Sequence, residues 1–231
     1  IASTGKIPFA STFAHFAAGR AFDQIRNSVA YPKLNVKICP THAGVSLGED
    51  GGSHQSVEDM ALMRSLPGMV VLSPADAVET EKMIFAVAEY EGPVYVRLGR
   101  LNIPVLFDEN YKFEIGKAHT LTEGNDVAII ATGLMVYEAA EAAKLLEKEG
   151  IKARVINMST IKPLDEETVL KAAKECKFIV TSEEHSVVGG LGSAVSEYLS
   201  EVHPTKVVKH GIYDVFGQSA DGETMLNNYN L

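Results

Sequence analysis

The sequence predicts an α/β protein made of two three-layer domains, each rich in parallel sheet. Apolar strand segments alternate with helical segments along most of the 231 residues. The alternation fades only between Leu101 and Asn125, where Asn, Pro, Asp and Gly recur. Parallel strands joined by helices are covered on both faces. We therefore expect a first domain at 1–105, a linker at 106–125 and a second domain at 126–231.

The first half alternates short apolar strands with helices. Apolar residues recur at helical spacing in 12–29, and Asp76 with Glu79 three residues later marks a helix N-terminus. Ser56 stands in the same relation to Asp59. The half lacks an opening strand and helix, so we expect it to be truncated at its N-terminus. The predicted strands are 5–10, 36–39, 69–72 and 94–98, and the predicted helices are 12–29, 56–66 and 77–90.

The second half resumes the alternation after a linker with room for a small hairpin. Asp165 is placed to cap one helix, and Gly150 is placed to end another. The predicted strands are 127–131, 153–158, 178–181 and 205–209, and the predicted helices are 136–150, 165–176 and 190–202.

Composition excludes several classes of protein. The chain carries 30 acidic and 21 basic residues, a formal charge of −9, which argues against general nucleic-acid binding. No apolar run reaches the roughly 18 residues of a membrane helix, so we expect no membrane partner. Two cysteines, Cys39 and Cys176, are too few for a disulfide scaffold or a four-thiolate zinc site. The composition fits the reducing cytoplasm.

The loop at 41–55, THAGVSLGEDGGSHQ, is the most informative segment. It follows a predicted strand and precedes a helix, which is where α/β sheets place their active sites. It is also longer than the roughly 2–6 residues usual for such connections. Two other interpretations stay open at this point, namely a solvated surface loop and a zinc site made by His42, Asp50 and His54.

Within this loop, the sequence LGEDGGSHQ at 47–55, preceded by Thr41-His42, resembles the GEDGPTHQ segment of transketolases. Other segments agree in order with that family, and the resemblance covers the whole chain. It corresponds to the pyrimidine-binding and C-terminal domains, as in transketolases that are split into two polypeptides. The other matching segments are STFAHF at 11–16, RSLP at 64–67, PAD at 74–76, RLNIP at 100–104, EEH at 183–185 and GGLGSA at 189–194.

The resemblance implies an enzyme that transfers a two-carbon ketol unit from a ketose phosphate to an aldose phosphate. It implies thiamine diphosphate as cofactor, bound between this pyrimidine-binding domain and a diphosphate-binding domain or subunit. Mg²⁺ or Ca²⁺ is then expected on that partner and not on this chain. The resemblance also implies a homodimeric assembly acting on sugar phosphates.

The same resemblance assigns the cofactor-binding residues. Phe13 and Phe16 match the aromatic side chains that stack on the aminopyrimidine ring, an arrangement worth about 0.5–1.5 kcal/mol beyond burial. Gly19 stands where the family has a third aromatic residue. From the residues alone, Phe13 and Phe16 are better interpreted as core positions of an amphipathic helix, so their assignment rests on the resemblance.

Four further residues match groups that act on the substrate in the family. His54 matches the catalytic histidine beside the reactive carbon, where a group with a near-neutral pKa suits proton transfer. Asp50 matches the carboxylate that binds a substrate hydroxyl. His42 and Arg100 match the phosphate-binding groups, and the planar guanidinium of arginine suits phosphate oxygens.

Two features of the family do not occur in this sequence. No Glu precedes Glu49, although the family places a cofactor-activating glutamate before the segment that matches Phe13. The GDG-type motif that holds the metal and diphosphate does not occur either. We therefore expect this chain to be inactive without an N-terminal segment and a diphosphate-binding partner.

Three rival functions remain open. A 1-deoxyxylulose-5-phosphate synthase tends to have Asp-Arg where this chain has Thr41-His42. The β subunit of a 2-oxo acid dehydrogenase E1 lacks the E-D-G…H-Q pattern. The third rival is a non-catalytic regulatory or assembly paralogue.

The second half carries weaker signals. The glycines of GGLG at 189–192 follow a strand and open a helix, as in an anion site. Glu183 and His185 could be ligands, but such residues are more often structural. We interpret this domain as an assembly module.

Overall fold

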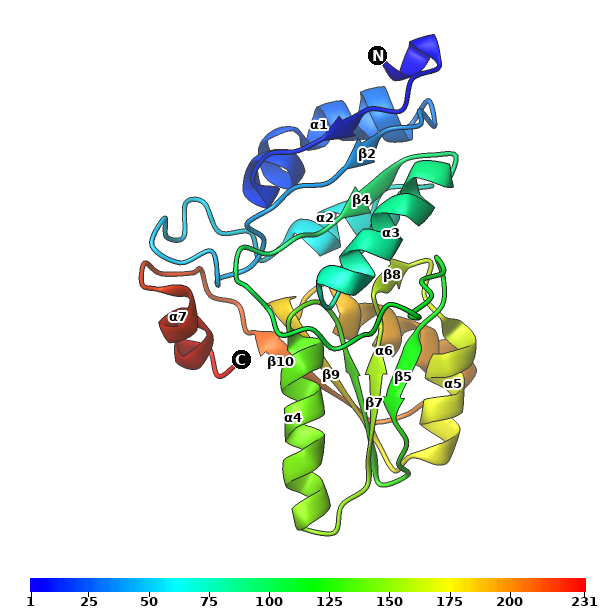
Figure 1. Ribbon diagram of the computed structural model, residues 1–231, viewed down its shortest axis with the longest axis vertical. Helices are drawn as coiled ribbons and strands as arrows, with labels where there is room; N and C mark the ends of the chain where they lie inside the picture. The colour runs from blue at the N-terminus through cyan, green and yellow to red at the C-terminus, as the bar shows by residue number, and fades with distance from the viewer.

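The first half of the chain builds a five-stranded sheet, as the α/β class predicts. The computed structural model describes residues 1–231 (Figure 1). β8 is antiparallel to β3 and the other neighbours are parallel. The strands lie in the order β1 (Phe9–Ala10), β2 (Lys37–Ile38), β4 (Val94–Val96), β3 (Val70–Leu72) and β8 (Thr160–Lys162). The last of these strands was not predicted, and it comes from the second half of the sequence.

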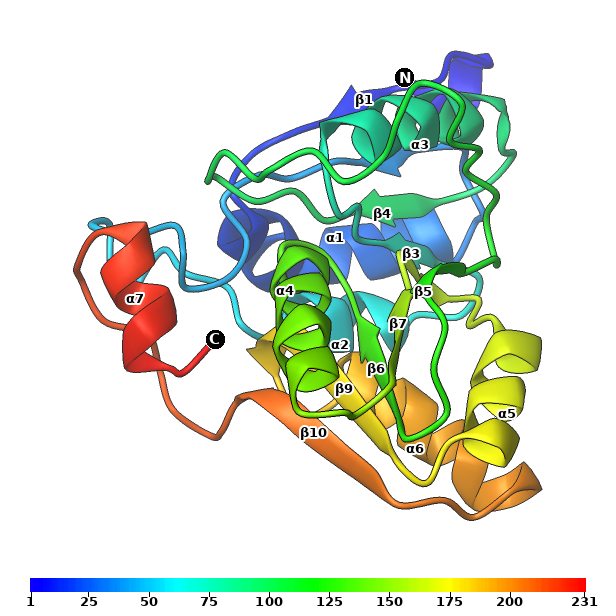
Figure 2. The same cartoon turned by 60° about the horizontal axis from the view of Figure 1, so that its bottom comes forward.

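The second sheet also has four parallel strands and one antiparallel edge strand, which confirms the predicted class for this half. Its order is β10 (Val207–Ile212), β9 (Ile179–Ser186), β6 (Val127–Ala131), β7 (Ala153–Asn157) and β5 (His119–Thr122). β5 belongs to the segment predicted as linker, and its pairing with β7 makes that segment part of the sheet (Figure 2).

Two of the predicted helix caps are confirmed and one is wrong. Asp76 accepts a hydrogen bond from Glu79 N, and Asp165 accepts one from Thr168 N. Ser56 does not cap the helix, since its Oγ forms no hydrogen bond and its carbonyl pairs with the amide of the loop residue Gly44 at 2.8 Å. The helix predicted at 56–66 therefore begins only at Asp59, behind Glu58.

The remaining helices follow the predicted order. None of them is both long and apolar enough to cross a bilayer. The helix predicted at 12–29 is α1 (Phe22–Ile25) flanked by two π-helical segments, and α7 was not predicted. The bounds are His15–Arg20 and Arg26–Ala30 for the π-helical segments, α2 Asp59–Arg64, α3 Ala77–Glu89, α4 Met135–Lys148, α5 Glu166–Glu175, α6 Leu191–Val202 and α7 Gly222–Asn228.

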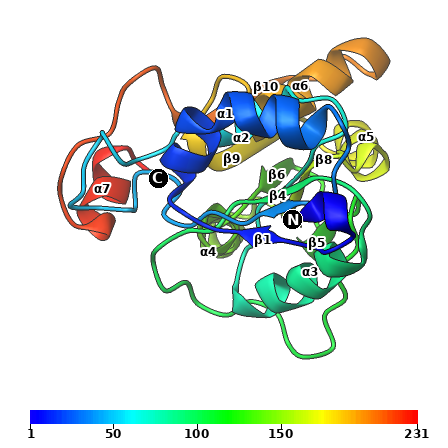
Figure 3. The ribbon, with the colours of Figure 1, turned by 90° about the horizontal axis from the view of Figure 1, so that it is seen from above.

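Side chains alternate between the two faces of each sheet, which gives three layers per half. In β3, Val70 and Leu72 pack against α3, whereas Val71 faces the opposite side. In β6, Val127 and Ile129 pack with α4 in the same way. Figure 3 shows α3 and α4 on one side of the molecule and α1, α2 and α6 on the other.

The helices on that second side share one hydrophobic core across both halves. Met60 and Met63 of α2 belong to the same buried cluster as Leu191 and Val195 of α6. α5 and strand β7 contribute further members. The two sheets are therefore joined by packing as well as by the chain that connects them.

Buried polar side chains also connect the halves. Oδ2 of Asp76 accepts hydrogen bonds from Leu106 N and Phe107 N at 2.7 and 2.8 Å, which fixes the start of the linker. The Glu79 carboxylate accepts from Asn157 Nδ2 of β7 at 2.9 and 3.0 Å. Both acids lie at the N-terminus of α3, where negative charge is stabilised by the helix dipole.

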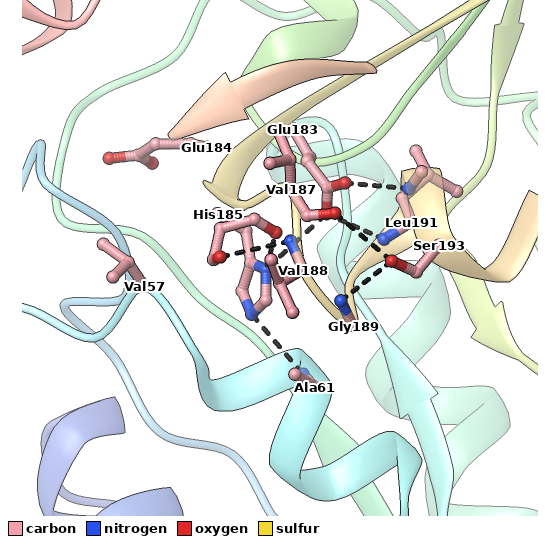
Figure 4. A network of polar contacts seen from close by, with 12 residues as sticks. Val57, Ala61, Glu183, Glu184, His185, Val187, Val188, Gly189, Leu191 and Ser193 are labelled. Carbon is pink, nitrogen blue, oxygen red and sulfur yellow. Dashed lines mark hydrogen bonds and ion pairs between the residues drawn. The ribbon is translucent and has the colours of Figure 1, made fainter. Parts of the chain in front are cut away.

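The glycine-rich start of α6 is occupied by a side chain of the protein itself. The Glu183 carboxylate accepts hydrogen bonds from Leu191 N and Gly192 N at 2.7 and 2.8 Å (Figure 4). A side chain on Gly190 would lie 2.0 Å from that carboxylate. The predicted anion site at 189–192 is therefore filled from within, and Glu183 is structural.

His185 is buried and neutral between the two halves. Its Nε2 accepts a hydrogen bond from Ala61 N at 3.4 Å, so Nδ1 carries the proton and donates to Ser186 O at 2.7 Å (Figure 4). Burial lowers the pKa of His185 to about 4, and the nearby Asp59 carboxylate only partly offsets this effect.

The pKa of His185 predicts a loss of stability in acid. Between pH 6.5 and pH 4 the unfolded chain binds a proton that the folded chain does not, so stability falls as pH falls through this window. The wild type should lose about 2 kcal/mol more free energy of unfolding between pH 7 and pH 5 than His185→Gln. Urea denaturation at both pH values measures this difference, and parallel losses in the two proteins would contradict it.

The Glu183→Gln variant should change the pH dependence of stability in the opposite direction to His185→Gln. Burial raises the pKa of Glu183 to about 7, so the folded chain binds the extra proton between pH 4.5 and pH 7. This carboxyl stabilises the fold as pH falls, and its removal should steepen the acid loss.

Candidate active site

Four of the predicted site residues meet in one aromatic cluster. The Phe13 and His42 rings stack with their centroids 4.1 Å apart and their planes 11° apart. Phe16 lies nearly parallel to Phe13 at 6.0 Å. The His54 ring meets Phe13 edge-on at 6.2 Å and Phe16 at 5.3 Å. The cluster therefore connects the helix after β1 with both ends of the loop 41–55.

Asp50 and Arg100, the other two predicted residues, pair with each other beside this cluster. Nη1 of Arg100 lies 3.4 Å from Oδ2 of Asp50 and 3.5 Å from Oε2 of Glu49, and it donates to Leu47 O at 2.5 Å. The Arg100 and Asp50 side chains are 41% and 46% exposed. Exposed pairs of this kind contribute about 0–1 kcal/mol, so a ligand can displace them.

His42 links the aromatic cluster to the charged pair. Burial is the main cause that lowers its pKa, and the positive charge of Arg100 acts in the same direction. The Asp50 carboxylate acts in the opposite direction. The six predicted residues follow the carboxyl ends of the neighbouring parallel strands β1, β2 and β4, so they gather at one end of the first sheet.

Backbone pairing explains why the loop returns to the aromatic helix. Thr41 bridges to Phe13 in parallel, and Thr41 O accepts from Ala14 N at 2.8 Å. Ala43 N then donates to Leu98 O, beyond the end of β4. These bonds place His42 over Phe13, and His42 adopts a left-handed φ of 63°, a conformation uncommon for residues other than glycine.

Each histidine of the cluster has one ring nitrogen engaged by a neighbouring hydroxyl. Nδ1 of His54 lies 2.9 Å from Ser53 Oγ, and Nδ1 of His42 lies 2.7 Å from Thr41 Oγ1. The Nε2 atoms form no hydrogen bond within the chain. Each imidazole can therefore present Nε2 to a bound molecule while its orientation is fixed from the other side.

The metal interpretation of the loop receives no support. No group of three His, Cys, Asp or Glu side chains is placed to hold a metal ion. His42 and His54 instead pack against Phe13, and Asp50 pairs with Arg100.

The sequence did not reveal the residues from the second half that contact the loop. Glu184 accepts from Ser46 N at 2.6 Å, and Gln218 O accepts from Gln55 Nε2 at 2.8 Å. Residues far apart in sequence carry no local pattern that would pair them. Only the EEH segment, which contains Glu184, was singled out by its resemblance.

Comparison with known proteins identifies both halves. A family model described as the transketolase pyrimidine binding domain matches residues 1–105. Another, described as the transketolase C-terminal domain, matches residues 116–231.

Related proteins agree with this result. A transketolase C-terminal section from Methanocaldococcus jannaschii is 50% identical over the whole chain, which spans 73% of that relative. A 6-deoxy-6-sulfo-D-fructose transketolase subunit from a Clostridium species is 44% identical over 94% of the chain and 68% of its own length. The solved structure of a split gene transketolase, described as an "inactive beta4 tetramer", superposes with a TM-score of 0.93 at 55% identity. The superposition covers 100% of this chain and 74% of the chain in that structure. The chain therefore belongs to the transketolase family.

Proposed function

We propose that this chain is the pyrimidine-binding and C-terminal part of an enzyme that transfers a two-carbon ketol unit from a ketose phosphate to an aldose phosphate. The observation that carries the proposal is the meeting of His54, His42, Asp50 and Arg100 beside two parallel phenylalanine rings. A module that served only assembly would not need these polar groups together at one end of the first sheet.

The aromatic cluster fits the cofactor that the family implies. Phe13 and Phe16 are only partly buried, and their nearly parallel rings can hold a flat heteroaromatic ring such as an aminopyrimidine. Thiamine diphosphate, when bound, supplies the electron sink that ketol transfer requires. We assign its diphosphate and the Mg²⁺ or Ca²⁺ to a partner domain or subunit.

His54 is the proposed catalytic residue of this chain. Ser53 engages Nδ1, so Nε2 is the atom that can exchange a hydrogen bond or a proton with substrate oxygens. The edges of Phe13 and Phe16 fix the plane of the imidazole. This arrangement keeps a proton donor and acceptor at a fixed position.

The proposed substrate-binding residues divide by charge. Arg100 and His42 would bind the phosphate, which can displace the weak surface pairs that Arg100 makes with Asp50 and Glu49. A phosphate dianion would also favour the protonated form of His42. Asp50, released from Arg100, could accept a hydrogen bond from a sugar hydroxyl.

We also propose that activity requires assembly with a diphosphate-binding partner. The related split gene structure is described as an "inactive beta4 tetramer", which supports self-association of this kind of chain without activity. A dimer of heteromeric pairs, located in the cytoplasm, is the assembly we propose for the active enzyme.

The function is tested with the complete gene product, alone and mixed with a diphosphate-binding subunit. Thiamine diphosphate, Mg²⁺ and a ketose phosphate donor should give ketol transfer to an aldose phosphate only in the mixture. Pyruvate as donor separates the synthase and dehydrogenase rivals, and a sulfonated ketose tests the substrate named for the Clostridium relative. Full activity from the chain alone would refute the partner requirement, and pyruvate turnover would refute the assigned reaction.

His54→Ala in the active assembly should lower kcat by about 10²–10⁴-fold, the usual contribution of a general acid or base. His119→Ala is a matched control, because the His119 ring also meets two aromatic rings edge-on, those of Phe107 and Tyr111. Steady-state kinetics and melting temperatures are measured for both variants. If His54→Ala loses activity only in proportion to its melting temperature, His54 is structural.

Arg100→Ala should raise KM for phosphorylated donors about tenfold or more, which corresponds to losing one charge-assisted hydrogen bond. KM for the same sugar without phosphate should change much less. Arg26→Ala, which removes an exposed arginine from the π-helical segment Arg26–Ala30, is the control. Equal effects on phosphorylated and free sugars would remove the phosphate role from Arg100.

A further inference from the structure

A carboxylate from the second half contacts the loop that carries the proposed substrate-binding residues. Oε1 of Glu184 accepts a hydrogen bond from Ser46 N at 2.6 Å. Glu184 is 3% exposed and Ser46 is 1% exposed, so water does not compete for this bond. Ser46 lies midway between His42 and Asp50 in the sequence. The contact therefore fixes the backbone that joins those two side chains.

The loop approaches Glu184 too closely for any side chain at position 44. A Cβ on Gly44 would lie 2.2 Å from the carboxyl carbon of Glu184. Gly44 also has a φ of +85°, which glycine adopts without strain. A larger residue there must displace either the carboxylate or the loop.

Glu184 belongs to a strand that is itself held by a buried ion pair. Nη2 of Arg97 donates to Glu184 O at 2.9 Å, and Nε donates to Oδ2 of Asp59 at 2.9 Å. Burial raises the pKa of the Glu184 carboxyl, whereas the charge of Arg97 and the bond from Ser46 N act in the opposite direction. The loop is thus bonded to a part of the interior with little freedom to move.

The neighbouring Glu183 is also a buried glutamate, but its carboxylate makes no hydrogen bond to the loop. Successive residues of a strand point to opposite faces, and Figure 4 shows the two carboxylates directed away from each other. Glu183 bonds Leu191 N and Gly192 N, both of α6. Its role is confined to the second half, whereas Glu184 reaches the first.

We propose that Glu184 is a positioning residue for sugar-phosphate binding, which acts from the C-terminal domain by fixing the loop between His42 and Asp50. This inference rests on the proposed function. Two further contacts act in the same direction, since Gln218 O accepts from Gln55 Nε2 at 2.8 Å and Ser219 Oγ donates to Glu49 O at 2.5 Å.

Glu184→Ala in the active assembly should raise KM for the ketose phosphate about tenfold, because one buried charge-assisted bond to the loop is lost. The kcat should change much less. The thiamine diphosphate concentration for half-maximal activity should change less than KM, because Phe13 and Phe16 belong to the segment after β1 and not to the loop that Glu184 bonds. Glu184→Gln keeps an oxygen acceptor for Ser46 N and should restore most of the affinity.

Glu183→Gln is the matched control, since it alters an equally buried carboxyl on the same strand. It should change the melting temperature and leave KM unchanged. If Glu184→Ala does not fold, Gly44→Ala retains every charge and should raise KM for the same reason. Equal KM values for Glu184→Ala and Glu183→Gln would overturn the proposal.

Amide hydrogen exchange provides a readout that does not depend on activity. The Ser46 amide should exchange faster in Glu184→Ala than in the wild type or in Glu183→Gln. Unchanged protection of Ser46 would overturn the positioning role. A wild-type assembly without ketol transfer would instead contradict the proposed function. The hydrogen exchange of Ser46 would then still test the contact between Glu184 and the loop.

Discussion

The buried guanidinium of Arg97 connects three parts of the molecule that are far apart in the sequence. It pairs with Asp59 at the start of α2, lies 3.5 Å from the carbonyl of Ser56 at the end of the loop, and donates to the carbonyl of Glu184 in β9. Removing one partner of such a pair costs about 3–5 kcal/mol, because the other charge stays buried without compensation. The relative placement of loop, helix and second sheet depends on this group.

The shared core explains how that ionic centre can be buried. Helices of both halves pack in one hydrophobic cluster, so the interface between the two sheets excludes water as a domain interior does. A charge in such an interior needs an opposite charge and hydrogen-bond partners. Arg97 is paired with the Asp59 carboxylate through Nε, and its Nη2 donates to the carbonyls of Ser56 and Glu184. The C-terminal half is therefore part of the framework of the candidate site.

The site itself combines fixed and displaceable contacts. The aromatic cluster and the buried bond from Ser46 to Glu184 hold the backbone and the ring planes. The pair between Arg100 and Asp50 is half-exposed and weak, so it can open when a charged ligand arrives. This combination of a rigid base and a polar rim supports the proposed binding of anionic sugars at the loop.

The sequence by itself determined the alternation of strands and helices, the caps at Asp76 and Asp165, and the family, because these features are encoded locally or in collinear motifs. The resemblance also selected the six residues that gather at the carboxyl end of the first sheet. Only the tertiary structure revealed β8, which leaves its own half to join the first sheet, and β5, which turns the predicted linker into a strand. It likewise decided that Glu183 fills the predicted anion site and that Glu184 holds the loop. The bond from Ser46 to Glu184 spans 138 positions, whereas the bonds from Leu191 and Gly192 to Glu183 span only 8 and 9. In both cases no periodicity or local propensity records which backbone groups a buried carboxylate will meet.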